Sequence, residues 1–197
     1  MYQMKNGMLR IVTLMAALTC GVANAAAISV DMVPGGTINN SLSLTEGTSF
    51  DVDILIDDAT DLAGFEFDLN FDSAVLSANS VTSGDIFGLD TFLIDDTISA
   101  GSVSFSEMTF ALSGLDVTTP TVLATISFDT LAAGTSLLNL TDVVLSDSLA
   151  YSILPVTNSG GVLTVTGGGS NSVPEPATLF LLFGGLIGIV GLGRKKV

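Results

Sequence analysis

The stretch that decides the fold is Leu62-Ala63-Gly64-Phe65-Glu66-Phe67-Asp68-Leu69-Asn70-Phe71-Asp72-Ser73-Ala74-Val75-Leu76. Within it, apolar residues at 65, 67, 69 and 71 alternate with polar residues at 66, 68, 70 and 72. A period of two places the apolar side chains on one face of a strand and the carboxylates on the other. The stretch therefore predicts a strand of an antiparallel sheet with one face against a core and one face in water.

The same alternation recurs on both sides of this stretch. The further predicted strands are 28–32, 50–57, 91–95, 102–110, 121–128, 136–140 and 161–166. In 50–57 the pattern is broken only by Leu55, which it places on the outer side with the aspartates. Glycines after Glu46, Ser83, Ala100 and Ala133 mark turns between these segments. Many short strands without a long helical pattern predict an all-β sandwich.

The charge distribution excludes whole classes of function. The chain of 197 residues has a formal net charge of −15, and between Ile11 and Gly193 it contains no Lys, Arg or His. Such a surface repels phosphate backbones, so we expect no nucleic-acid binding. Mechanisms that need a His or Lys base have no residues to use. The scattered carboxylates are typical of a solvated surface, and we expect no enzymatic activity.

Residues 1–25 have the organisation of a secretory signal peptide. Lys5 and Arg10 supply the positive region, 11–18 is the apolar stretch, and Ala23 and Ala25 form a small-x-small cleavage site. We expect cleavage after Ala25, with Ala27 as the second choice. Cys20 offers the alternative of a lipoprotein signal. Cleavage after Ala25 removes this single cysteine, and a disulfide is then excluded.

The C-terminus has three parts in a fixed order. Pro174, Glu175 and Pro176 hold the backbone extended and deny it helical hydrogen bonds. The apolar run 177–193 is near the lower limit for a transmembrane helix, roughly 17 residues. Arg194, Lys195 and Lys196 follow it and set the topology by staying on the cytoplasmic side. A Gly/Ser linker, 167–172, precedes all three parts.

This order closely resembles the PEP-CTERM sorting signal of Gram-negative bacteria, over residues 173–197. The resemblance implies recognition by an exosortase, a membrane cysteine transpeptidase that cuts near the Pro-Glu-Pro sequence. It also implies an intermediate tethered transiently to the inner membrane and then delivered to the cell surface or extracellular matrix. The alternative is a plain C-terminal membrane anchor.

The body of the chain, residues 26–166, resembles the cohesin-like domain. The residues that carry the likeness are Phe71-Asp72 and Val75-Leu76 after the alternating strand, and the later segments 123–128, 132–136, 143–147 and 160–165 in the family's order. The resemblance implies a jelly-roll sandwich of about nine strands, related to carbohydrate-binding modules. The family is best known for binding dockerin modules, but its dockerin-contact residues form no sequence motif that could be matched in this chain.

Calcium is the one cofactor that the acidic residues suggest. Asp57, Asp58 and Asp61 lie together in one predicted loop, and Ca²⁺ takes oxygen ligands. The alternative is a polar turn in which aspartate binds the backbone. No other cofactor is indicated.

The sequence thus predicts an exported, non-enzymatic surface or matrix protein whose sandwich binds another protein module or an exopolysaccharide. The alternatives are a carbohydrate-binding module of a polysaccharide-processing system and dockerin-type protein binding. The chain has no Trp, and its tyrosines are Tyr2 and Tyr151. This scarcity of the aromatic platforms that sugars commonly stack on weighs against the carbohydrate alternative.

Overall fold

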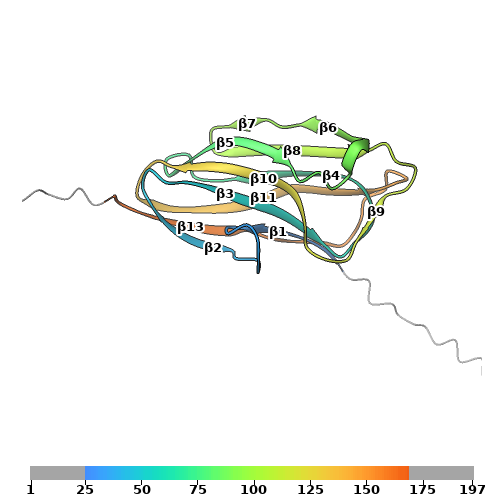
Figure 1. The fold of residues 1–197 in the computed structure, drawn as a ribbon, viewed down its shortest axis with the longest axis horizontal. Coiled ribbons are helices and arrows are strands. Elements are labelled where there is room, and N and C mark those ends of the chain that lie inside the picture. The colour runs from blue at the N-terminus through green and yellow to red at the C-terminus, as the bar shows by residue number, and fades with distance from the viewer. Residues whose placement is uncertain (1–24, 169–197) are drawn as a thin grey trace, which may run out of the picture.

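The computed structural model describes residues 25–168, and its two β-sheets pack face to face (Figure 1). The strands are β1 (Ala26–Asp31), β2 (Ser41–Thr45), β3 (Ser49–Asp57), β4 (Ala59–Asn70), β5 (Leu76–Ser83), β6 (Thr91–Asp95), β7 (Ile98–Ser99), β8 (Ser102–Thr109), β9 (Leu115–Val117), β10 (Thr121–Thr130), β11 (Gly134–Asp147), β12 (Val156–Ser159) and β13 (Gly161–Thr166). One short 3-10 helix, η1 (Gly88–Asp90), precedes β6. The predicted all-β sandwich is confirmed.

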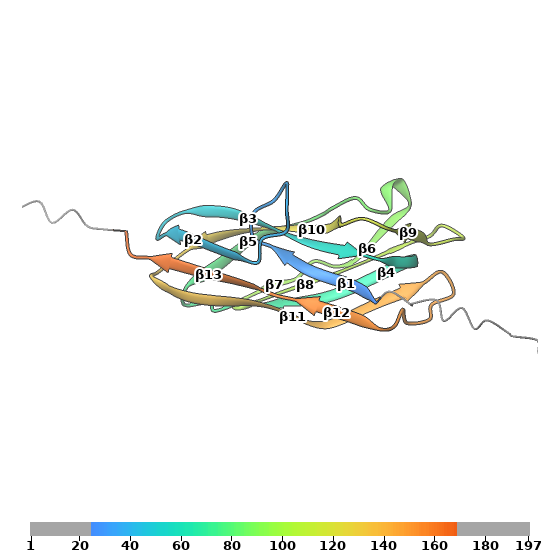
Figure 2. The same ribbon diagram turned by 90° about the horizontal axis from the view of Figure 1, so that it is seen from below.

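The sheets join distant parts of the chain. The five-stranded sheet has the order β12-β1-β3-β10-β5, and the eight-stranded sheet has the path β2-β13-β11-β4-β8-β6 with β7 beside β8 and β9 beside β4. Most pairs are antiparallel, but β1 with β12 and β2 with β13 are parallel. These two pairs hold the first strands of the domain against its last ones. In Figure 2, β13 leaves at one end of the sandwich, whereas β9 and the β11–β12 loop lie at the other.

The inward side chains of the alternating strands form the core. Phe67 and Leu69 of β4 are fully buried, and they belong to the same core cluster as Ile126 and Phe128 of β10 in the opposite sheet. The rings of Phe65, Phe67 and Phe105 pack at centroid distances of 6.0–6.5 Å. Burial of such side chains stabilises a fold by roughly 1.5–3 kcal/mol each. The alternation at 65–71 therefore places the apolar side chains in the core, as the sequence predicts.

Asp72 explains why an acidic residue ends this strand. Its carboxylate accepts a hydrogen bond from the Ala74 N–H at 2.9 Å, and its carbonyl accepts from the N–H groups of Val75 and Leu76 at 3.0 and 2.9 Å. The resulting turn points Val75 and Leu76 into the core, where they are 6% and 1% exposed. Ser136 of β11 accepts the N–H of Asp72 and fixes the turn against the sheet.

The described part of the chain has more strands than the expected nine or so, and five of them lie outside the strands predicted from the sequence. β2, β5, β7, β9 and β12 are short or rich in small polar residues, as in the β5 sequence Leu-Ser-Ala-Asn-Ser-Val-Thr-Ser. Three of them, β2, β5 and β12, end their sheets. A strand at an edge, or one covered on one side only, needs few apolar residues, so its pattern is weak.

Leu55 lies on the outer side of β3 with Asp53, as predicted, but this part of the outer face is not in water. Leu55 is 7% exposed and its neighbour Asp53 is 8% exposed, because the segment after β1 covers the outer face of the five-stranded sheet there. Asp31 holds that segment in place. Its Oδ1 accepts the N–H of Val33 at 3.1 Å and the N–H of Asn39 at 2.9 Å.

We predict that Asp31→Ala destabilises the domain by about 2 kcal/mol, since two hydrogen bonds to a buried carboxylate are lost. Asp31→Asn keeps an oxygen at the same place and is expected to cost much less. Urea unfolding followed by circular dichroism measures both. Equal losses in the two variants would show that the acceptor oxygen is not what holds the covering segment.

Candidate functional site

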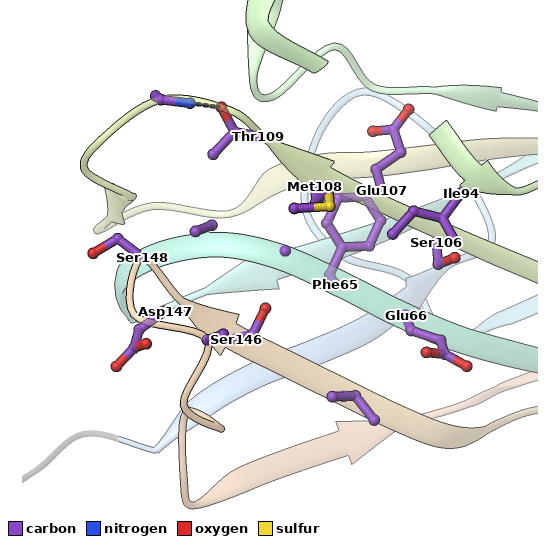
Figure 3. Close-up of a pocket in the computed structure, with 15 residues that line it drawn as sticks. Phe65, Glu66, Ile94, Ser106, Glu107, Met108, Thr109, Ser146, Asp147 and Ser148 are labelled. Atoms are coloured by element: carbon purple, nitrogen blue, oxygen red, sulfur yellow. Dashed lines mark hydrogen bonds between the residues drawn. The ribbon is translucent and has the colours of Figure 1, made fainter. Parts of the chain in front are cut away.

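The candidate site lies on the outer face of four adjacent strands, β11, β4, β8 and β6. The strand register places Ser146, Gly64, Met108 and Phe92 side by side in one row across these strands. The next row contains Val144, Glu66 and Ser106. The residues therefore come from segments far apart in the sequence, and only the sheet brings them together (Figure 3).

Gly64 makes this face hollow. A Cβ atom at this position would lie 2.7 Å from the Ser146 Oγ and 3.5 Å from the Met108 Cβ. Without a side chain there, the strands enclose a shallow cavity of about 240 Å³ above Gly64. In Figure 3 the labelled residues Ser146, Ser106, Met108 and Glu66 surround this space.

Exposed apolar side chains gather around the hollow. We call them the outer-face patch, and its members with their exposed fractions are Phe92 (48%), Ile94 (58%), Met108 (37%), Phe110 (66%) and Val144 (47%). The rings of Phe92 and Phe110 lie 5.4 Å apart at 54°, which is an attractive tilted arrangement. A contiguous exposed apolar patch with polar neighbours is typical of an interaction surface.

The polar groups at the site are acceptors and hydroxyls. Glu66 is exposed, and Ser106, Ser146 and Ser148 line the cavity. Asp147 also lines the cavity, but its carboxylate accepts the N–H groups of Leu149 and Tyr151 at 2.9 and 2.8 Å. The polar side chains around the cavity are therefore hydroxyls and carboxylates, and they give this surface a negative charge.

Asp61 fixes the loops at the end of the site. Its Oδ1 accepts the Gly114 N–H at 2.7 Å, and its Oδ2 accepts the Ser148 hydroxyl at 2.7 Å. Its own N–H donates to Asp116 at 2.9 Å. The hydrogen bond from Ser148, followed by that from Gly114, lowers the pKa of Asp61 below its ordinary value.

The structure adds no support to the calcium interpretation of Asp57, Asp58 and Asp61. Asp61 is engaged as described, and Asp57 accepts the N–H of Asp58 at 2.9 Å, as in a polar turn. Within residues 25–168, no three acidic side chains are grouped so that they would hold a metal ion. Calcium binding here stays a prediction.

Sequence reasoning missed Glu107 of β8. This side chain is 2% exposed and points to the inner side of the sheet, away from Ser106 and Met108. The sequence does contain a signal for a buried Glu107, because every second residue of this strand before it, Val103 and Phe105, is apolar and buried. An acid in an apolar register predicts a buried carboxylate.

The other predicted site residues fall outside the described part of the chain. These are Ala23, Pro174, Glu175, Pro176, Arg194, Lys195 and Lys196. Ala25 is the first described residue, and β1 begins directly after it. From residue 25 to residue 168, no helix has the length and apolarity that crossing a bilayer requires. The predicted membrane helix 177–193 lies beyond these residues.

Comparison with known families gives two matches. The model of the cohesin domain matches residues 36–164, and the model of the PEP-CTERM protein-sorting motif matches residues 172–195. No curated protein matches the chain significantly.

Solved structures share the fold. A cohesin from scaffoldin B of Acetivibrio cellulolyticus, in complex with a dockerin, is 15% identical with a TM-score of 0.56, covering 72% of this chain and 99% of its own. A non-cellulosomal cohesin from the archaeon Archaeoglobus fulgidus is 12% identical with a TM-score of 0.57, covering 77% and 99%. A type II cohesin from the cellulosome of A. cellulolyticus is 18% identical with a TM-score of 0.55, covering 71% and 95%.

The hydrogen bonds to Asp61 predict a pH dependence of stability. Because the pKa of Asp61 is lower in the folded protein, its stabilising contribution is present above the unfolded value, about 3.9, and is lost as the pH falls through the folded pKa. Asp61→Asn should be less stable at neutral pH and lose less on acidification. Thermal unfolding at several pH values measures this.

Asp58→Asn is the control variant for Asp61→Asn, because residues 58 and 61 both have a positive φ that Asn tolerates. The same acid loss in Asp61→Asn and wild type would contradict the assignment.

Proposed function

Since the chain belongs to the cohesin family, we propose that it is an exported, non-enzymatic interaction module that binds another protein domain through its outer-face patch. The observation that supports the proposal most is the patch itself, in which Ile94, Met108 and Val144 line the hollow and the exposed rings of Phe92 and Phe110 lie next to them.

The shape of the site suits a protein better than a small molecule. The cavity of about 240 Å³ is smaller than the roughly 300–1,000 Å³ typical of small-ligand pockets, and it is shallow. It has room for a single apolar side chain of a partner, with Phe92 and Met108 covered by the partner's surface. Such a central anchor with a polar rim is the usual arrangement at protein interfaces.

Charge narrows the kind of partner. Glu66 lies at the rim, and no Lys, Arg or His occurs in the chain between Ile11 and Gly193. A partner that places Lys or Arg around an apolar centre would be attracted at long range and held in register. Related cohesins have been solved in complex with dockerins. We therefore propose a dockerin-type module, or another small basic domain, as the partner.

Exopolysaccharide binding is the second candidate. The exposed rings of Phe92 and Phe110 lie against each other, and Phe92 is the register partner of Met108, which lines the cavity together with Ser106 and Ser148. Sugars commonly place their apolar C–H faces on aromatic rings and their hydroxyls on polar neighbours. The 54° tilt between these rings leaves no continuous flat platform, so this observation supports the candidate less strongly.

For delivery, we propose an exported chain made of a signal peptide (1–25), the cohesin domain (26–166), a linker (167–172) and a sorting signal (173–197). Cleavage after Ala25 would leave β1 whole, because β1 starts at Ala26, whose side chain is buried. An exosortase would cut near Pro174–Pro176 while helix 177–193 holds the intermediate in the inner membrane and Arg194–Lys196 stays in the cytoplasm. The mature protein would then reach the cell surface or matrix.

The position of the end of β13 is consistent with a C-terminal tether to the membrane. β13 runs out at the end of the sandwich opposite to β9 and the β11–β12 loop (Figure 2). The cavity is lined from this loop, through Ser148 and Ala150, and so lies toward the far end. A tether that follows Thr166 would hold the outer-face patch away from the membrane.

We predict that Met108→Lys weakens binding of a dockerin panel at least about tenfold, because a charge is placed at the centre of an apolar contact. Leu131→Lys is the control, since Leu131 is also exposed but lies in the β10–β11 turn. Calorimetry with the exported protein measures both, and purified exopolysaccharide is titrated in parallel. Equal affinities of Met108→Lys and Leu131→Lys for the dockerin would contradict binding at the outer-face patch. Saturable binding of polysaccharide alone would favour exopolysaccharide as the ligand.

We predict that a host with an exosortase removes the tail and releases or surface-attaches the protein. The combined change Glu175→Ala, Pro176→Ala should block this step and leave the protein in the inner membrane. Intact mass and cell fractionation provide the measurement. If wild type and variant are both uncut, the C-terminus is a permanent anchor.

A further inference from the structure

A buried carboxylate lies between the two sheets beneath the outer-face patch. Glu107 of β8 is 2% exposed, and its Oε2 accepts a hydrogen bond from the Ser83 hydroxyl of β5 at 2.9 Å. β8 and β5 belong to different sheets, so this contact joins them. No other hydrogen bond to the Glu107 carboxylate occurs within the described residues. A single neutral donor is weak compensation for a buried negative charge.

The surroundings of Glu107 disfavour its charge further. Its register partners are Phe65 on β4 and Leu93 on β6, which are both apolar. Burial raises the pKa of Glu107, the Ser83 hydrogen bond opposes this, and the negative charge of Asp85 raises the pKa again. No cation is available, because residues 11–193 contain no Lys, Arg or His.

The other acidic residues on the neighbouring strands either point away from Glu107 or lie far from it along their strand. Glu66 of β4 is on the outer face, and Asp95 of β6 accepts hydrogen bonds from Thr97. Asp129 of β10 pairs with Ser77, six residues along β5 from Ser83. Asp90 is in η1, on the same segment as Asp85.

Ser83 connects Glu107 to the segment that carries part of the patch. The Ser83 Oγ that donates to Glu107 also accepts the N–H of Asp85 at 2.9 Å, so it organises the start of the segment 84–90. This segment contains η1 and leads directly into β6, which supplies Phe92 and Ile94 to the patch. Ser83 therefore links Glu107 to the segment that carries one side of the outer-face patch.

We propose that Glu107 is an acid-responsive clamp: when it is protonated, the edge formed by residues 84–95 is held closed, and when it ionises, this edge opens locally more readily. The sign follows from linkage. A group that is harder to ionise in the folded state contributes stability that is complete below the ordinary glutamate pKa of about 4.3 and is lost as the pH rises through the folded value. That the clamp regulates partner binding rests on the proposed function, whereas the opening itself does not.

Hydrogen exchange of the exported protein without any partner tests the clamp. Amide protection of residues 84–95 is compared with that of β3 at about pH 4 and about pH 7, after correction for intrinsic exchange. In wild type we expect the ratio of protection at residues 84–95 to protection at β3 to fall at least about fivefold from pH 4 to pH 7. In Glu107→Gln the ratio should stay constant. Glu66→Gln is the control, because it removes a carboxylate from the exposed side and should behave like wild type.

Ser83→Ala keeps the test decisive if Glu107→Gln folds poorly. It removes the one donor to the ionised carboxylate and should enlarge the loss of protection toward pH 7. The clamp is overturned if Glu107→Gln loses protection as wild type does, if Ser83→Ala leaves the loss unchanged, or if the loss spreads evenly over β3 and the edge. Because no partner is present, failure of partner binding at the outer-face patch does not affect this result.

Discussion

The constraint that the rest of the structure depends on is the absence of any cation between residues 11 and 193. No carboxylate of the domain can form an ion pair with another side chain of the domain, so those that are held are held by N–H and O–H donors. Asp31, Asp72 and Asp147 accept backbone N–H groups and shape the segments that follow them. Hydrogen bonds to an ionised acceptor are stronger than neutral ones, so these contacts replace the missing ion pairs.

Hydroxyls complete this arrangement on the outer face of the five-stranded sheet. Asp51, Asp53 and Asp129 accept hydrogen bonds from Ser127, Thr125 and Ser49, each across a strand pair. The hydrogen bond from Ser49, followed by that from Asn79, lowers the pKa of Asp129. Glu107 differs from them, because it is buried with one hydroxyl as its donor and its pKa is raised. The domain therefore contains carboxylates whose contributions to stability change in opposite directions with pH.

The same constraint bears on recognition. Negative charge is spread over the domain and an apolar patch lies on one sheet face, so the partner that we propose would place apolar groups at the centre of the contact and cations at its rim. Salt screens such attraction over about 8–10 Å. Ionic strength should therefore change the association rate more than it changes the strength of the apolar contact at Met108 and Phe92. Gly64 makes the centre available by leaving room that a side chain would fill.

The sequence by itself determined the class of fold, because alternation such as that of Phe65–Phe71 is local and a sheet repeats it every two residues. It also showed that residues 26–166 contain no Lys, Arg, His or Cys, and it carried the motifs of the cohesin domain and the sorting signal. Only the tertiary structure decided what lies side by side. The burial of Leu55 depends on a segment that Asp31 folds over it, and the row Ser146–Gly64–Met108–Phe92 depends on registers between strands distant in the chain. The contact of Glu107 with Ser83 depends on how two sheets pack, and no local pattern contains that information.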